Sequence, residues 1–235
     1  MEGKADSLSA STIAPLGLGA LLLAMGIGRF AFTPLLPLMQ AHGTLGSGQG
    51  AWLAAAAYCG YLAGALACIV RAPEPQHATR AAMVAVTVLT LCMGLTTGLE
   101  WWLLLRFAAG IASAYVLVSV SAWALPSLAE VGRASWSGVV FAGVGIGITL
   151  VGIVTLVMSS TNPANVWITL GAISAAVSAL SWLPMGQVTD GVPAYSPSRE
   201  CLRAGEWRLI MCYGFSGFGY IIPATFLPAV ARVGR

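Results

Sequence analysis

Seven long apolar runs dominate the sequence and decide which folds are open to it. They lie near residues 13–40, 49–70, 78–97, 101–125, 136–158, 166–183 and 209–230. A helix needs about 20 apolar residues to cross the hydrocarbon core of a bilayer, which is about 30 Å thick. The runs are unbroken and lack the polar–apolar alternation of a membrane barrel. The sequence therefore predicts an all-α integral membrane protein.

Composition supports this fold class and excludes several functions. Hydrophobic residues make up 58% of the chain and charged residues only 8%, which is far more apolar than a soluble domain tolerates. The basic residues are scattered singly, which excludes a nucleic-acid partner. The five cysteines form no CxxC pair and show no metal-ligand spacing. We therefore expect no metal, no cofactor and a lipid bilayer as the surroundings.

Lysine and arginine in the connections predict the orientation. The three connections "AHGTLGSG", "TGLE" and "SSTNPAN" carry none, whereas the alternate segments hold Lys4, Arg71, Arg80, Arg133, Arg199, Arg203 and Arg208. Basic residues concentrate on the cytoplasmic side of membrane proteins. We expect a multi-pass protein of the cytoplasmic (inner) membrane with a cytoplasmic N-terminus, although Arg232 and Arg235 count against this orientation.

A linker and an internal repeat predict the domain organisation. Residues 184–207 are rich in Pro, Ser and Gly and separate a six-helix bundle (1–183) from a last helix (208–235). A shift of 191 positions aligns "GIGRFAFTPLLP" with "GFGYIIPATFLP", so the seventh helix repeats the first. Such a parallel repeat is typical of transporters built from two six-helix halves. We expect a complete bundle, a cytoplasmic linker and the first helix of a second, truncated bundle.

The first run contains a costly arginine, Arg29, in "MGIGRFAFTPLLPLMQ". Arginine near the bilayer centre costs at least about 2.5 kcal/mol. Pro34 and Pro37 remove helix hydrogen bonds, and Gly26 and Gly28 loosen the preceding turn. We expect a bent, partly opened helix, which survives in a membrane where it is buried in protein or lines a watery cavity. Arg29 would then bind a substrate or, alternatively, clamp free carbonyls for structure alone.

A second arginine, Arg106, lies roughly 8 Å below the outer boundary by helix rise. It could reach the headgroups, or it could stack on Trp102 one helical turn away. Its helix face continues through Gly110 and Ser113, a strip that would line a cavity or admit a close neighbour. The sequence alone leaves two roles open for Arg106, Gly110 and Ser113. They line the transport pathway, or they serve contacts outside it.

Acidic residues are informative because of where they lie. All eight occupy tails, loops or the ends of the predicted spans, so none is placed for a proton relay at mid-membrane. Arg29 and Arg106 would leave net positive charge in the pathway, which an anionic solute would neutralise. A carboxylate for proton coupling would be Glu100 at the rim or would lie in the second half.

Glycine pairs predict close helix packing. Gly60 and Gly64 in the second run and Gly143 and Gly147 in the fifth run are each four residues apart. This small-xxx-small spacing lets the backbones of membrane helices approach closely. We interpret both pairs as packing surfaces and not as a nucleotide-binding loop, because no strand precedes them.

Several stretches resemble one branch of a known transporter superfamily: "GIGRFAFTPLLPLM", "GYLAGAL", "LRFAAGIASA", "GVGIGI" and "GFGYIIPATFLPAVAR". Together they resemble the YbfB/YjiJ branch of the major facilitator superfamily. The resemblance implies a fold in which helices one and four line the central pathway. Two departures are the connection "RAPEPQHATR", which lacks the usual Asp, and a fifth run without the Gly-Pro pair of superfamily antiporters, which argues against export by exchange.

These observations favour a secondary active transporter that moves a small anionic or polar organic solute by alternating access, coupled to protons. The alternatives are a membrane-embedded enzyme and a non-transporting channel or assembly subunit. The spans contain no His or carboxylate cluster for catalysis, so we expect no enzyme. The candidate substrate-binding residues are Arg29, Phe30, Thr33, Arg106, Ser113 and Tyr220. The candidate hinge residues are Gly26, Gly28, Pro34, Pro37, Pro223 and Pro228.

Overall fold

The computed structural model describes residues 9–46, 48–71, 74–187, 206–217 and 219. Every regular element in this part of the chain is helical. The elements are α1 (Ala10–Leu21), the π-helical segment η1 (Leu22–Arg29), α2 (Phe32–Ala41), α3 (Gln49–Val70), α4 (Pro75–Leu95), α5 (Leu99–Glu130), the 3-10 turn η2 (Ala134–Trp136), α6 (Ser137–Val157) and α7 (Pro163–Gln187).

Six helical stretches in the described residues are long and apolar enough to cross a membrane. The first combines α1, η1 and α2 into a span of 32 residues, and the others correspond to α3, α4, α5, η2 with α6, and α7. This confirms the predicted all-α membrane fold and the positions of the first six runs. The seventh predicted run, 209–230, is described only at 209–217 and at Gly219, where it is helical.

The outer surface of these helices is apolar. Trp52, Ile69 and Leu104 are 69, 70 and 61% exposed, an arrangement that water would penalise. A surface of this kind is suited to acyl chains, because lipid tails are as apolar as the side chains that face them. The exposed apolar surface therefore agrees with the span lengths in placing the bundle in a bilayer.

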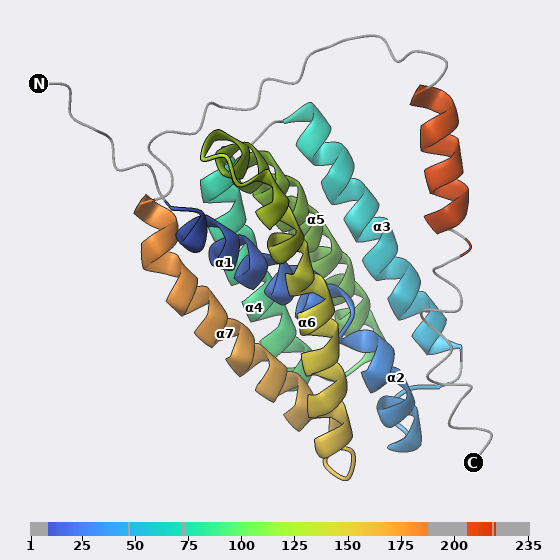
Figure 1. The fold of residues 1–235 in the computed structure, drawn as a ribbon. Helices are drawn as coiled ribbons and strands as arrows, with labels where there is room; N and C mark the ends of the chain where they lie inside the picture. The colour runs from blue at the N-terminus through green and yellow to red at the C-terminus, as the bar shows by residue number, and fades with distance from the viewer. Residues whose placement is uncertain (1–8, 47, 72–73, 188–205, 218, 220–235) are drawn as a thin grey trace, which may run out of the picture.

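The first span is the most buried element of the bundle (Figure 1). On one side α1 and η1 pack against α6, and on the other they contact α5. Helix α3 packs mainly against α5, and α4 packs against both α5 and α7. The first span therefore lies between neighbours on several sides, and any change in its backbone is felt by most of the bundle.

Glycines set the spacing of two of these helix pairs, as the sequence predicts. A Cβ built on Gly60 of α3 would lie 2.0 Å from the carbonyl oxygen of Phe107, and one on Gly143 of α6 would lie 2.2 Å from that of Leu18. Real Cβ atoms do not approach backbone this closely. The two contacts confirm that the small-xxx-small pairs are packing surfaces.

Basic residues gather at one end of the bundle, where α1 begins and α7 ends (Figure 1). Arg71 follows α3, Arg80 lies in the second turn of α4 and Arg133 follows α5. Arg80 donates a hydrogen bond to the carbonyl of Trp182 in α7, and its guanidinium lies 4.9 Å from the centre of that indole ring. Arg80 therefore joins α4 and α7 at this end.

Candidate functional site

The first span is interrupted in its interior, at the place where the glycines and prolines predict an opened helix. Residues Leu22–Arg29 form a π-helix, and Phe30 and Ala31 form a turn before α2 begins at Phe32. Pro34 stands in the first turn of α2, where its missing N–H is tolerated. Short π-helical stretches inside α-helices are frequent at functional sites.

Close packing against α6 fixes the π-helical segment in place. A Cβ on Gly26 would lie 2.4 Å from the Cα of Gly147, and one on Gly147 would lie 2.6 Å from the carbonyl oxygen of Leu22. Both atoms are backbone, which cannot yield as a flexible side chain would. Gly26 therefore serves close packing, in addition to the loosening of the helix that the sequence suggests.

The interruption rearranges the backbone hydrogen bonds around Phe30. Pro34 has no N–H to donate to the carbonyl of Phe30, and this carbonyl instead accepts a hydrogen bond from the backbone N–H of Thr33 at 3.2 Å. A tight turn therefore replaces the helical hydrogen bond that Pro34 removes.

Arg106 of α5 bonds two backbone carbonyls at the interruption. Its two terminal nitrogens donate hydrogen bonds of 3.0 Å each to the carbonyl oxygens of Gly28 and Arg29. Hydrogen bonds from a charged donor contribute about 1.5–3 kcal/mol each, and an unsatisfied carbonyl in the hydrocarbon region costs several kcal/mol. The role of carbonyl clamp, which the sequence left open for Arg29, is performed by Arg106.

The surroundings of Arg106 test two contacts that the sequence suggests for its side chain, one with the lipid headgroups and one with the Trp102 ring. Arg106 is only 3% exposed, so it does not reach the headgroup region. Its guanidinium lies 5.2 Å from the centre of the Phe32 ring. Trp102 instead directs its indole N–H to the carbonyl of Thr96 at 3.2 Å. Both the headgroup contact and the Trp102 stack are therefore wrong for this conformation.

Ser113 and Gly110 continue the Arg106 face of α5 and meet close neighbours. The Ser113 hydroxyl lies 2.9 Å from the carbonyl oxygen of Ala24 in η1 and 2.8 Å from that of Ala109. A Cβ on Gly110 would lie 2.2 Å from the carbonyl oxygen of Ala57 in α3. In this conformation the strip serves helix contact, and Ser113 bonds the π-helical segment from the same side as Arg106.

Arg29 is half-buried and its side chain is surrounded by aromatic rings. The guanidinium carbon lies 4.1 Å from the centre of the Tyr61 ring and 5.5 Å from the centres of the Tyr58 and Phe30 rings. A cation over an aromatic face gains about 0.5–2 kcal/mol, with the larger values where water is excluded. The aromatic rings therefore hold the charge of Arg29 inside the bundle without neutralising it.

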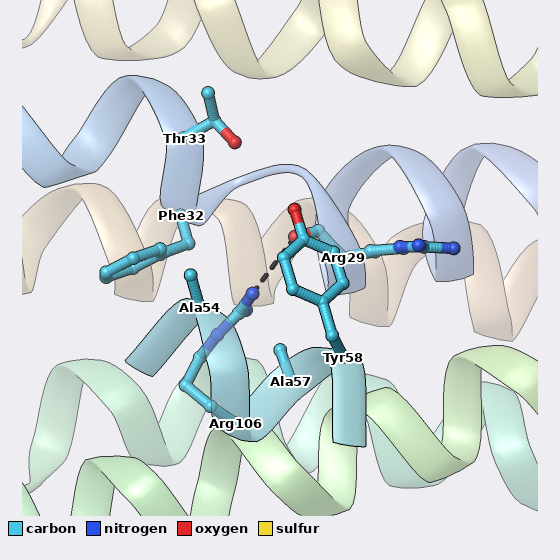
Figure 2. Close-up of a pocket in the computed structure, with 7 residues that line it drawn as sticks. All are labelled: Arg29, Phe32, Thr33, Ala54, Ala57, Tyr58 and Arg106. Atoms are coloured by element: carbon cyan, nitrogen blue, oxygen red, sulfur yellow. Dashed lines mark hydrogen bonds between the residues drawn. The ribbon is translucent and has the colours of Figure 1, made fainter. Parts of the chain in front are cut away.

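A small cavity lies at the interruption, between the first span, α3 and α5 (Figure 2). Its volume is about 10 Å³ and its walls are formed by Arg29, Phe32, Thr33, Ala54, Ala57, Tyr58 and Arg106. In Figure 2 the Arg106 side chain points toward the backbone of Arg29, while the Arg29 side chain extends away from Thr33 and Phe32. About 10–15 Å³ is the space that one water molecule needs.

The structure brings together some of the predicted binding residues and separates others. Arg29, Thr33 and Arg106 all line the cavity, whereas Phe30 contacts Arg29 without lining it and Ser113 lies beside the π-helical segment. Three predicted positions, Tyr220, Pro223 and Pro228, lie outside the described residues.

Sequence reasoning missed the two tyrosines of α3 that contact Arg29. Tyr58 and Tyr61 are three residues apart, which places them on one face of a helix. The available signal was this pair of tyrosines in one predicted span, while another predicted span carries a cation with no acidic partner.

The acidic residues that the structure describes stand apart from this cavity. Glu74, Glu100, Glu130 and Glu206 are exposed and lie at the ends of helical stretches. In this part of the chain no three His, Cys, Asp or Glu side chains come close enough to hold a metal ion. The cavity therefore carries two guanidinium groups and no carboxylate among the residues that line it.

Comparison with known proteins gives one family. A family model described as "Uncharacterised MFS-type transporter YbfB" matches residues 21–235. No curated protein and no solved structure matches the chain.

Proposed function

The chain belongs to the YbfB-type family of major facilitator superfamily (MFS) transporters, and on this basis we propose that it is a secondary active transporter for a small anionic organic solute. It would work by alternating access across the cytoplasmic membrane, with its N-terminus in the cytoplasm. The observation that carries the proposal is the pair of arginines at the interrupted first span, which share a cavity without a carboxylate.

Charge is the reason for choosing an anion. Arg29 and Arg106 place two positive charges in the membrane interior, and arginine there is costly unless it is paired. The contacts of Arg106 with carbonyl dipoles compensate part of its charge. Arg29 contacts aromatic rings, which leaves its planar fork suited to a carboxylate or a similar oxyanion. In this proposal Arg29 binds the solute and Arg106 positions the backbone around it.

The size of the cavity supports a mechanism with more than one conformation. A volume of about 10 Å³ does not admit an organic solute. A solute that binds at Arg29 therefore needs the first span to move relative to α3 or α5. The π-helical segment with its following turn supplies a place where the backbone of the first span can bend, and we propose Gly26, Gly28, Pro34 and Pro37 as the residues that make this bending possible.

Proton coupling is part of the proposal for a physical reason. Moving one negative charge inward against an inside-negative potential costs about 2.3 kcal/mol per 100 mV. An anion that crosses together with a proton moves no net charge and avoids this cost. Import together with a proton therefore avoids the free-energy cost of moving an anion against the membrane potential. A protonophore, which dissipates the pH gradient, should abolish this import.

The test is uptake into proteoliposomes that contain the full-length protein. Radiolabelled small carboxylates, amines and uncharged sugars of similar size are compared under an inward proton gradient. We expect saturable uptake of one or more carboxylates, loss of most of it in Arg29→Gln and partial retention in Arg29→Lys, which keeps the charge but loses the fork.

Arg71→Gln is the matched control, because Arg71 is exposed at the end of α3. It removes the same charge outside the cavity and should transport normally. Uptake that is restricted to amines or sugars, or that is unchanged in Arg29→Gln, would contradict the proposed anion function.

A further inference from the structure

Arg29 directs its guanidinium toward the tyrosines of α3 and away from the small cavity. Figure 2 shows that its side chain extends away from Thr33. The guanidinium carbon lies 4.1 Å from the centre of the Tyr61 ring and 5.5 Å from the centres of the Tyr58 and Phe30 rings. The cationic end of Arg29 therefore lies among aromatic rings.

The cation and its rings are accessible from outside the helices. Arg29, Phe30, Tyr58 and Tyr61 are each only partly buried, and all four lie in the interior of membrane spans. A partly exposed arginine that faced lipid would be costly, whereas one that faces a watery pathway keeps part of its hydration. In the proposed transporter, a solute can therefore meet Arg29 on this aromatic side before the first span moves.

The rings limit the kind of anion that fits beside Arg29. A carboxylate pairs with the N–H groups in the plane of a guanidinium, so the rest of the solute would lie against the rings that surround this group. Aromatic side chains favour other aromatic rings in offset-stacked or edge-to-face arrangements. A solute that carries several hydroxyl groups would lose hydration on these apolar faces without gaining enough hydrogen bonds in return.

We propose that the transported solute is an aromatic carboxylate, whose carboxylate group binds Arg29 while its ring packs against Tyr58 and Tyr61. These two tyrosines, together with Phe30, are then the residues that determine specificity. The inference rests on the proposed anion transport and adds the chemical class of the anion.

Three carboxylates that differ only in the ring test this preference: benzoate, cyclohexanecarboxylate and glucuronate. Isothermal titration calorimetry measures their dissociation constants for the purified full-length protein at neutral pH, where all three are ionised. We expect benzoate to bind about two- to tenfold more tightly than cyclohexanecarboxylate, and glucuronate to bind most weakly. Cyclohexanecarboxylate has an apolar ring without π electrons, so the comparison separates aromatic contact from burial alone. All three should lose affinity in Arg29→Gln.

Variants of the two tyrosines identify the residues that carry the preference. The ratio of the benzoate and cyclohexanecarboxylate dissociation constants is compared, because a ratio within one preparation does not depend on how much of the protein is folded. Tyr58→Leu and Tyr61→Leu should each bring the ratio closer to one, whereas Tyr58→Phe and Tyr61→Phe keep the ring and should preserve it. Tyr115→Leu is the matched control, because Tyr115 is a partly buried tyrosine that lines a groove between α4 and α5.

The outcomes separate this inference from the proposed function. Binding that depends on Arg29 but does not distinguish benzoate from cyclohexanecarboxylate would overturn the aromatic preference and leave the anion function intact. Undetectable binding of benzoate, or a benzoate preference that survives both leucine variants, would also overturn it. Uptake of non-aromatic carboxylates into proteoliposomes would still support the proposed function in those cases. Carboxylate binding and uptake that are both unchanged in Arg29→Gln would contradict the function and the inference together.

Discussion

Arg106 donates a 3.0 Å hydrogen bond to the backbone carbonyl of Arg29, so the side chain of one arginine supports the main chain of the other. The two residues are 77 positions apart, and the contact joins the fourth span to the interruption of the first. The roles of the two cations differ as a result. Arg106 donates to the backbone, whereas the Arg29 guanidinium lies over the rings of Phe30, Tyr58 and Tyr61.

Replacement of Arg106 should destabilise the protein, because its side chain bonds two backbone carbonyls inside the bundle. Arg106→Gln removes two charge-assisted hydrogen bonds, which we expect to lower the free energy of unfolding by about 3 kcal/mol or more. Arg106→Lys keeps one cation that can reach one carbonyl and should fall between Gln and the wild type. Thermal unfolding in detergent measures both, with Arg71→Gln as the exposed control. If Arg106→Gln unfolds at the wild-type temperature, the carbonyl clamp has no energetic role.

The ring of Tyr61 should matter more than its hydroxyl for solute affinity. Its centre lies 4.1 Å from the Arg29 guanidinium, and a cation–π contact contributes about 1 kcal/mol or more away from water. We expect Tyr61→Leu to raise the half-saturation constant for uptake by about tenfold, and Tyr61→Phe, which keeps the ring, to have a smaller effect. Uptake kinetics in proteoliposomes give both values. A larger defect in Tyr61→Phe than in Tyr61→Leu would show that the hydroxyl carries the effect.

The parts of the fold that depend on local sequence were predictable. Apolar length located the first six spans, and α3 begins and ends at the predicted residues 49 and 70. The density of Gly and Pro around Arg29 predicted an opened helix, because both residue types act on their own turn of backbone. Glycine spacing predicted the close contact of α3 with α5 and that of α6 with the first span, since residues four positions apart lie on one helix face.

The roles of the two arginines were not predictable, because they depend on which side chains meet across the bundle. The sequence shows that Arg29 and Arg106 are both costly, but it does not show that Arg106 lies opposite the carbonyls of Gly28 and Arg29. These outcomes follow from packing between spans that are far apart in the chain.

Two neighbouring glycines of α6 should respond differently to the same substitution. A Cβ on Gly147 would meet the backbone of Leu22 at 2.6 Å and that of Gly26 at 2.7 Å, whereas one on Gly145 would meet nothing within 4 Å in the described part of the chain. Gly147→Ala should therefore destabilise by about 1–3 kcal/mol. Gly145→Ala should be neutral or slightly stabilising, because alanine favours the helix. Thermal unfolding of the two variants distinguishes them, and equal midpoints would contradict the close contact between α6 and η1.

The orientation of the protein can be tested by labelling single cysteines in a variant that lacks the five native ones. The basic residues Arg71, Arg80 and Arg133 lie at the end of the bundle where α1 begins, and the positive-inside rule assigns that end to the cytoplasm. Ser160 is exposed in the connection between α6 and α7, at the opposite end. We expect a cysteine at position 160 to react with an impermeant maleimide added to intact cells. A cysteine at Ser196, in the linker predicted to be cytoplasmic, should react only after the membrane is permeabilised, which also serves as the control for its reactivity. The reverse pattern would place the N-terminus outside, and the arginines would then no longer indicate the cytoplasmic side.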